Sequence, residues 1–357
     1  MPSRPSVLEG LRLLGALVSP FSTRESLLAD WPATPPWQDL LAQADKHRLI
    51  PALHVTLVRH GLLDRVDAEL AELLAAVADW NAERNEGFRR QMRTVSAAFN
   101  AAGLEPVWLK GALTLLPPEG PAAGRQMMDL DVWLPQESAQ RAAMQVLRGL
   151  GYVSEGPENV SPRHFPGFFH PDEMARIELH HSVVAPYEAL LPDDEAAQGV
   201  EWLDWEGLRI GQLDPMGRLL CSLQQCTDPR GSWLGIAEIP LVKALDLVQR
   251  VHDDFAGTVP AAFLARVKQA GWERSAQRLL TVTETCFDLP NPLPADPAQL
   301  RKMERFARSP RWHYTLRAAQ ALFGEGGRRI LRAPWQVPVM AAVFARRLIT
   351  PNAPREL

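Results

Sequence analysis

The sequence contains little cysteine, which limits the kinds of protein it can encode. Only Cys221, Cys226 and Cys286 occur among the 357 residues. Three scattered cysteines are too few for a disulfide framework, and their spacing matches no metal-binding motif. We therefore expect a protein of a reducing compartment and assign it to the cytoplasm.

Long apolar runs are also missing from the sequence. No stretch of about 18 uninterrupted apolar residues occurs, so the sequence predicts no membrane span. The first ten residues hold no apolar segment of the kind that a secretory signal needs, and we expect no such signal. The chain shows no internal repeat and no low-complexity tract.

Neither sign of charge is present in large excess. The chain has 38 Lys and Arg against 42 Asp and Glu, for a formal net charge of −4. This balance argues against broad, nonspecific binding to nucleic acid, although it leaves room for a local basic groove. The 46% hydrophobic and 22% charged residues are typical of a globular protein, long enough for two or three structural units.

The residues that suggest chemistry gather between positions 107 and 134. An apolar run at 107–109 ends on Lys110-Gly111, and a second run at 132–134 follows Asp129-Leu130-Asp131. Because successive side chains of a strand point to opposite faces, Asp129 and Asp131 would share one face, about 7 Å apart. Two like charges placed in this way repel each other, so the pattern predicts a compensating cation.

A later segment adds a third carboxylate. Glu178 lies between two apolar residues in Arg176-Ile177-Glu178-Leu179-His180, which again has the alternation of a strand. If this strand lies beside the aspartates, the three carboxylates form a site for a hard divalent ion. His180 would share the face of Glu178. There it could form a hydrogen bond with that carboxylate, contact a substrate, or be a core histidine hydrogen-bonded to the backbone. His181 would point the other way.

These motifs, in this order, resemble a known family. Leu109-Lys110-Gly111, Arg125, Asp129-Leu130-Asp131 and Glu178-Leu179-His180 are similar to the signature of bacterial nucleotidyltransferases of the polymerase-β-like superfamily, in a poorly characterised branch. The resemblance covers roughly residues 104–184. One departure is that most of the superfamily carries Gly-Ser where this chain has Lys110-Gly111.

The resemblance implies both a fold and an activity. The expected fold class is α/β (α+β), with a small mixed-sheet nucleotidyltransferase core flanked by N- and C-terminal helical regions. The expected activity is metal-dependent transfer of a nucleoside monophosphate from a nucleoside triphosphate, with ATP as the first choice, to an unidentified acceptor with release of pyrophosphate. Asp129, Asp131 and Glu178 would bind Mg²⁺ or Mn²⁺ and carry the catalysis.

Lys110, Gly111 and Arg125 are the residues expected to bind the nucleotide. A glycine lets phosphate approach the backbone, and a helix N-terminus with an ammonium group supplies positive potential. The guanidinium of Arg125 has the geometry to hold a phosphate. On local sequence alone, Lys110 and Arg125 also fit plain surface cations, and this alternative stays open.

The pattern of helices and strands predicts three regions. Residues 1–102 are predicted to be helical, and 62–102 to form one long helix or two helices joined near Gly87. Residues 103–213 are predicted to form the α/β core, and 214–357 to be helical again. Within the core we expect strands at 104–109, 127–134 and 176–184, a helix at 136–150, and an edge strand or hairpin at 201–213. Beyond the core we expect helices at 216–226, 239–252, 261–270, 274–287, 298–307 and 314–323.

Other readings of the sequence remain. The same metal site could direct kinase-like phosphoryl transfer, or the scaffold could be a noncatalytic binding or regulatory protein, although three costly carboxylates argue against that. Phe165, Phe168 and Phe169 fit a hydrophobic plug better than a stacking platform for a base, and the arginine-flanked segment 328–347 fits a packed terminal helix. The spacing of His164 and His170 supports no zinc site. The acceptor could be a small molecule, a peptide or a protein.

Overall fold

The structure is a computed structural model of the whole chain. It describes residues 7–116, 124–156, 164–184, 189–226 and 239–308. The helix expected at 314–323 and the segment 328–347 lie outside the described residues.

A seven-stranded mixed sheet forms the α/β part of the molecule. Its strands lie in the order β3-β4-β5-β2-β1-β7-β6, with β2 parallel to β5, β1 parallel to β7, and the other neighbours antiparallel. The small mixed sheet predicted from the sequence is therefore confirmed. The strands are β1 (Val107–Trp108), β2 (Asp129–Trp133), β3 (Val153–Ser154), β4 (Phe168–Phe169), β5 (Arg176–His180), β6 (Val200–Trp205) and β7 (Leu208–Leu213).

The two faces of the sheet differ in what packs on them. Leu130 and Val132 of β2, with Ile177 and Leu179 of β5, are buried in a cluster with side chains from α5 (Ala68–Ala101) and α6 (Glu137–Gly149). Trp133 belongs instead to a second cluster formed largely by the other helices. Since side chains alternate along a strand, Asp129, Asp131 and Glu178 lie on the face opposite the first cluster. The acidic residues thus share the face of Trp133, whose cluster includes helices of both the N- and C-terminal regions.

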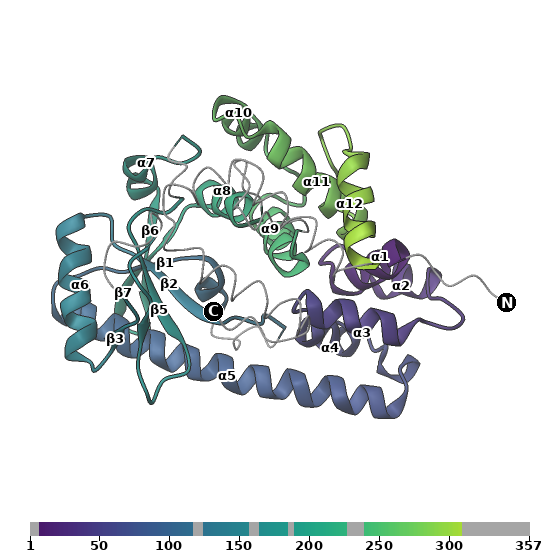
Figure 1. Cartoon of the computed structure of the whole chain (residues 1–357), viewed down its shortest axis with the longest axis horizontal. Coiled ribbons are helices and arrows are strands. Elements are labelled where there is room, and N and C mark those ends of the chain that lie inside the picture. The colour runs from purple at the N-terminus through teal and green to yellow at the C-terminus, as the bar shows by residue number, and fades with distance from the viewer. Residues whose placement is uncertain (1–6, 117–123, 157–163, 185–188, 227–238, 309–357) are drawn as a thin grey trace, which may run out of the picture.

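Helix α5 links the sheet to the N-terminal helices. Its 34 residues form one continuous helix, so the alternative of two helices joined near Gly87 is wrong. At 1.5 Å per residue it is about 51 Å long, and it runs along the base of the molecule from the sheet to α3 and α4 (Figure 1). Leu74 near its start is buried in one cluster, whereas Phe88 and Phe99 are buried in the other. The same helix therefore contributes to both cores.

The first and last described helices of the chain pack together. Helix α1 (Val7–Val18) contacts α11 (Glu273–Phe287) and α12 (Pro297–Arg308), although they are far apart in sequence (Figure 1). Directly after α1, the hydroxyl of Ser19 donates to the carbonyl of Phe287 at 2.7 Å. The N- and C-terminal helical segments hence share one hydrophobic cluster. The proposed division at residues 102/103 and 213/214 stays a prediction.

The remaining helices complete this helical body and border the sheet. They are α2 (Arg24–Ala29), α3 (Trp37–Lys46), α4 (Ile50–Arg59), α7 (Asp193–Gln198), α8 (Pro215–Cys226), α9 (Leu241–Asp254) and α10 (Ala261–Gln269), with 3-10 helices η1 (Leu63–Arg65) and η2 (Lys110–Leu115). None of these described helices combines the length and apolar character that crossing a membrane requires. All three cysteines are buried, and none of them forms a disulfide in the described structure.

The structure contains helices that the sequence pattern did not predict, among them α4 and α7. For α4, the spacing of apolar residues predicts a helix at 37–49 that Pro51 interrupts, but in the structure Pro51 lies in the first turn of α4. A proline is tolerated there because the first backbone N–H groups of a helix have no intrahelical partner. At 201–213 the structure forms a hairpin, β6 and β7, whose turn residues Glu206 and Gly207 both have positive φ, as two-residue hairpin turns require.

The packing of α1 on α11 gives a direct test of the fold. A Cβ added at Gly15 would lie 2.0 Å from the carbonyl oxygen of Cys286, whereas one added at Gly10 of the same helix would meet nothing within 4 Å. We expect Gly15→Ala to lower the free energy of unfolding by about 1–3 kcal/mol or more. Gly10→Ala should leave it unchanged or raise it by up to about 1 kcal/mol. Urea denaturation of the two variants checks this, and equal effects would contradict the packing.

Candidate active site

Parallel pairing of β2 with β5 brings the predicted carboxylates together. In this register Asp131 lies opposite Glu178, and Asp129 lies opposite Arg176. Residues opposite each other in neighbouring strands project from the same face of the sheet. Asp131 and Glu178 are therefore side by side, with Asp129 two residues earlier on the same face. Asp131 is almost fully buried, while Asp129 and Glu178 are half-buried.

Asp131 is the most connected of the three carboxylates. Its Oδ1 accepts a hydrogen bond from the Lys110 ammonium and lies 2.7 Å from Nε2 of His180. Burial alone would raise the pKa of Asp131, but the charge of Lys110 and the contact with His180 outweigh burial and hold that pKa well below its usual value. Asp131 is thus kept ionised inside the protein.

The other two carboxylates show the opposite shift. Burial raises the pKa of Glu178, and repulsion from Asp131 and Asp129 adds to the rise. Burial and repulsion from Asp131 likewise raise the pKa of Asp129. Clustering these groups therefore costs free energy, which a bound cation would recover.

Two histidines complete this acidic group. Burial and the nearby Lys110 charge lower the pKa of His180 to about 4, so its imidazole is neutral at neutral pH. The sequence placed His180 on this face, and the structure has it in contact with Asp131. Nε2 of His164, to which the sequence analysis gave no role, lies 3.6 Å from Oε2 of Glu178. No local sequence motif identifies His164 as a site residue. It reaches the site through an isolated antiparallel β-bridge that pairs it with His180 at the end of β5.

The turn after β1 aims Lys110 at the carboxylates. The amide of Leu109 donates to the carbonyl of Asp131 at 3.0 Å, and Lys110 then adopts the left-handed conformation with φ 53°. Despite its burial, the three carboxylates together raise the pKa of Lys110. The Met127 side chain fills the space in front of Gly111, where a Cβ would lie 3.0 Å from its sulfur. The glycine here permits close packing of the 125–127 segment.

Arg125 lies near this site but is engaged elsewhere. Its guanidinium forms a two-pronged ion pair with Asp246 of α9, at 2.8 and 2.7 Å. Its backbone carbonyl accepts from the side-chain amides of Asn81 and Asn85 on α5, at 3.3 and 2.8 Å. Arg125 therefore ties its loop to both helices. Its predicted contact with a nucleotide phosphate stays a prediction.

Helix α9 brings cations that the sequence analysis did not identify. Lys243, Asp246 and Arg250 have a spacing of three and four residues, which places them on one side of the helix. Burial lowers the pKa of Lys243 and Arg250. The Lys243 side chain has no hydrogen bond or ion pair among the described residues, yet its charge partly offsets the rise in the pKa of Asp129. The helical spacing was visible in the sequence, but nothing local indicated which side of α9 would face the carboxylates.

Arg84 of α5 is a further cation beside the acidic group. Burial lowers its pKa, and the charge of Asp129 acts in the opposite direction. Its guanidinium lies over the rings of Trp80 and Phe88, at 5.5 and 5.0 Å from their centroids. Its buried Nε and Nη2 atoms have no hydrogen-bond partner in the described part of the chain. Arg84 and Lys243 thus place positive charge near Asp129 from two different helices.

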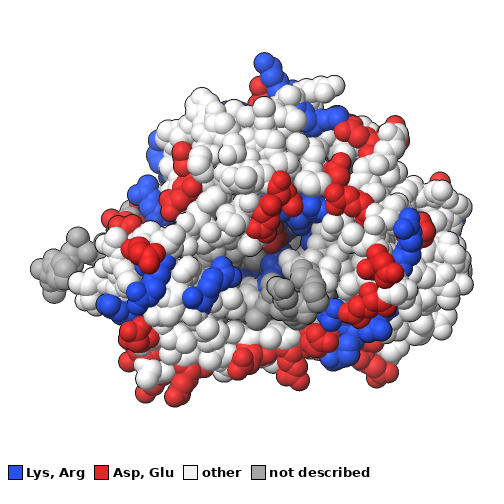
Figure 2. Space-filling model, turned by 180° about the vertical axis from the view of Figure 1, so that it is seen from behind, with Lys and Arg blue, Asp and Glu red and all other residues white. Residues whose placement is uncertain are grey.

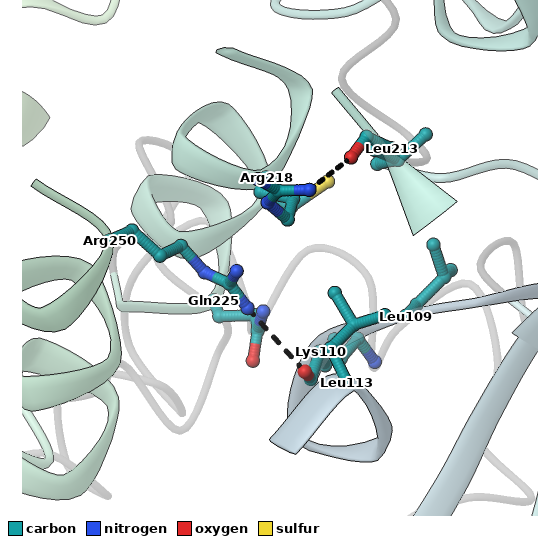
Figure 3. Close-up of a pocket in the computed structure, with 8 residues that line it drawn as sticks. Leu109, Lys110, Leu113, Leu213, Arg218, Gln225 and Arg250 are labelled. Atoms are coloured by element: carbon teal, nitrogen blue, oxygen red, sulfur yellow. Dashed lines mark hydrogen bonds between the residues drawn. The ribbon is translucent and has the colours of Figure 1, made fainter. Parts of the chain in front are cut away.

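A small cavity of about 10 Å³ lies between η2, β7, α8 and α9, beside Lys110 (Figure 3). In this view Arg250 points at the Lys110 carbonyl, to which its Nη2 donates at 3.5 Å, and Nε of Arg250 donates to Ser222 at 3.1 Å. The volume suffices for roughly one water molecule. The cavity is lined by Leu109, Lys110, Leu113, Leu213, Arg218, Cys221, Gln225 and Arg250.

Charged groups of both signs also meet on the surface. Figure 2 shows a hollow near the centre of one face, with basic side chains inside it and acidic side chains along its rim. On the rest of that face the two signs are interspersed. The described residues visible in this view form no broad basic surface of the kind that binds nucleic acid nonspecifically.

The donor set fits a divalent metal ion. Asp131, Glu178 and His180 each offer one ligand atom, and these atoms lie within 4.8 Å of one another. Metal–ligand bonds to oxygen and nitrogen measure roughly 2.0–2.4 Å, so a small adjustment of these side chains would let one ion bind all three. The ligands expected from the sequence were Asp129, Asp131 and Glu178, whereas this group contains His180 and does not contain Asp129. The imidazole, whose pKa is about 4, is neutral and can bind a metal ion through the ring nitrogen that does not carry its proton.

The aromatic residues near the site have mixed environments. Phe165 and Phe168 are buried, and Phe168 belongs to the cluster under the sheet, whereas Phe169 is 46% exposed. The ring of His181 packs on Phe165 with 3.8 Å between centroids. His181 thus points away from the carboxylates, as the alternation along β5 predicts.

Comparison with known proteins identifies a family. The family described as "Uncharacterised nucleotidyltransferase" matches residues 34–288, which is most of the chain. The matched range contains every carboxylate, cation and histidine of the candidate site. No curated protein and no solved structure matches the chain significantly.

The burial of neutral His180 predicts how stability depends on pH. Its pKa is about 4 in the folded state, against about 6.5 in an unfolded chain. The unfolded state therefore binds more protons between these values, so the contribution of His180 to stability is lost as pH falls from about 6.5 to about 4. Between pH 7 and pH 5 this amounts to about 2 kcal/mol.

We expect His180→Gln to flatten the pH dependence of the free energy of unfolding over that range. Urea denaturation at pH 7 and pH 5 measures it, with His252→Gln at an exposed histidine as the control. A slope that is the same in wild type and His180→Gln would contradict the assignment.

The ion pair between Arg125 and Asp246 can be tested by a double-mutant cycle. Both side chains are mostly buried, at 15% and 17% exposure, so removing one leaves an uncompensated charge. We expect Arg125→Gln and Asp246→Asn each to destabilise the protein, and the double variant to lose less than the sum, by about 0.5–3 kcal/mol. Thermal and urea unfolding give the coupling energy. Additive losses would show that the pair does not hold the loop to α9.

Proposed function

The chain belongs to the family of uncharacterised nucleotidyltransferases, and from this premise we propose that it moves a nucleoside monophosphate from a nucleoside triphosphate to an acceptor, releasing pyrophosphate. The acceptor is a small molecule, a peptide or a protein, and ATP is the donor to test first. The observation that carries the proposal is the register of β2 with β5, which places Asp131 opposite Glu178 with Asp129 on the same face.

In this proposal the carboxylates hold magnesium or manganese. Asp131, Glu178 and His180 form the group whose ligand atoms lie close enough to share one ion, and Asp129 extends the acidic face toward a second. A bound divalent ion supplies Lewis acidity, which polarises the phosphate and makes an acceptor hydroxyl more acidic. The imidazole of His180 favours manganese over magnesium, because magnesium prefers oxygen ligands.

Glu178 is the group we propose as proton acceptor. Its pKa is raised by burial and by the two aspartates, which makes it a better base than an ordinary carboxylate. Its Oε2 lies 3.6 Å from His164, which can orient it toward an acceptor. Asp131 has a lowered pKa and is suited to stay ionised as a ligand.

Lys243 is the residue we propose to receive the triphosphate from the side of α9. It is buried enough to have a lowered pKa, and it has no ion pair with any described residue. A buried cation without a partner is costly, and an anionic ligand would provide that partner. Lys110 and Arg125 remain candidates for phosphate binding, but in the described structure both contact carboxylates.

Calorimetric titration with a nonhydrolysable ATP analogue tests the proposal. We expect wild type to bind it only with Mg²⁺ or Mn²⁺, and Asp129→Asn/Asp131→Asn to weaken that binding at least about tenfold, which corresponds to about 1.4 kcal/mol. The control Asp79→Asn/Glu83→Gln removes two exposed carboxylates of α5 and should bind like wild type. Equal binding without metal, or equal binding by the Asp129/Asp131 variant, would refute the metal site.

Labelled ATP distinguishes nucleotidyl transfer from phosphoryl transfer. Incubation with an acceptor pool should transfer label from α-labelled ATP and none from γ-labelled ATP, because nucleotidyl transfer breaks the bond between the α- and β-phosphates. Transfer of the γ-label alone would instead indicate a kinase.

A further inference from the structure

Lys110 holds an unusual backbone position next to the metal-ligand group. It follows β1 directly, and its φ of 53° is left-handed, a conformation that costs a residue with a side chain roughly 1 kcal/mol or more. The bond from the Leu109 amide to the Asp131 carbonyl fixes the start of this turn, and Arg250 donates to the carbonyl of Lys110 itself. The backbone is thereby anchored on both sides, and the side chain extends from an anchored turn toward β2.

The ammonium of Lys110 contacts the same side chains that would hold a metal ion. It donates to Oδ1 of Asp131 and lies 3.3 Å from Nε2 of His180. Both residues belong to the group whose ligand atoms lie within 4.8 Å of one another. A lysine side chain is flexible and carries a compact charge. The ammonium can therefore occupy the position between these ligand atoms and can also move out of it.

We infer that Lys110 is the resident cation of the metal-free site and that a divalent ion entering the group of Asp131, Glu178 and His180 displaces it. The inference rests on the proposed function and specifies which positive charge balances the carboxylates when no metal ion is bound. The displaced ammonium then faces outward from the carboxylates, where it can meet the phosphates of the nucleotide. Lys110 would thus couple metal binding to nucleotide binding.

The charges around the site support an exchange of cations. Three carboxylates, Asp129, Asp131 and Glu178, act on the ammonium, which contacts Asp131 directly. Without a cation these carboxylates would repel one another in a partly buried place. Lys110 pairs directly with only one of the three carboxylates, Asp131, whereas no ion pair to Glu178 comes from a lysine or arginine among the described residues. Because Lys110 and the ion would use the same ligands, each should weaken the binding of the other.

Manganese titration of the full chain tests the exchange. We expect Lys110→Met to bind Mn²⁺ at least about tenfold more tightly than wild type, by calorimetry or by the electron paramagnetic resonance of free Mn²⁺. Lys110→Arg keeps the charge and should not gain affinity. Lys268→Met, at an exposed lysine of α10, is the matched control and should bind like wild type.

Lysine labelling of the unmutated protein supplies an independent readout. Brief acylation followed by mass spectrometry should modify Lys110 slowly in metal-free protein and faster with Mn²⁺, while the reactivity of Lys268 stays constant. Unchanged or slower labelling of Lys110 with Mn²⁺ would overturn the displacement.

The outcomes separate this inference from the proposed function. If wild type binds Mn²⁺ and Lys110→Met binds it equally or more weakly, the inference is wrong while the metal site stands. If neither protein binds Mn²⁺, the metal site is wrong and the inference falls with it. Binding by Lys110→Met alone would support the inference in its strongest form, with Lys110 excluding the ion.

Discussion

The parallel register of β2 and β5 is the constraint on which the candidate site depends. Asp131 faces Glu178 only because Leu130 and Val132 pack into the same core as Ile177 and Leu179. A slip of one residue would turn an entire strand's apolar set away from that core. The hydrophobic face of the sheet thus fixes the positions of the acidic side chains on the other face, where their mutual repulsion alone would drive them apart.

The repulsion among these carboxylates is offset by cations from separate parts of the chain. Lys110 comes from the turn after β1, Arg84 from α5 and Lys243 from α9. Each acts electrostatically on Asp129 or is acted on by it. The helical regions on either side of the sheet therefore contribute to the chemistry of the site as well as to its packing, which agrees with a family match that extends from residue 34 to residue 288.

The sequence predicted what depends on local spacing and missed what depends on long-range packing. The alternation around Asp129 and Asp131 predicted that these two share a face, because that period is local, whereas Glu178 could join them only if its strand lay beside theirs. The partner of Arg125 could not be foreseen, since Asp246 lies 121 residues away on a helix whose orientation only the fold determines. His164 and Lys243 were missed for the same reason. Helix α4 was missed because Pro51 is compatible both with the end of one helix and with the first turn of the next.

Crystals grown without metal and then soaked in Mn²⁺ would test the central claim most directly, through the anomalous scattering of manganese. The account predicts an anomalous peak bounded by Asp131, Glu178 and His180, with the Lys110 side chain withdrawn from Asp131 and the register of β2 with β5 unchanged. A Lys110 that remains bonded to Asp131, with no peak among the three side chains, would contradict it.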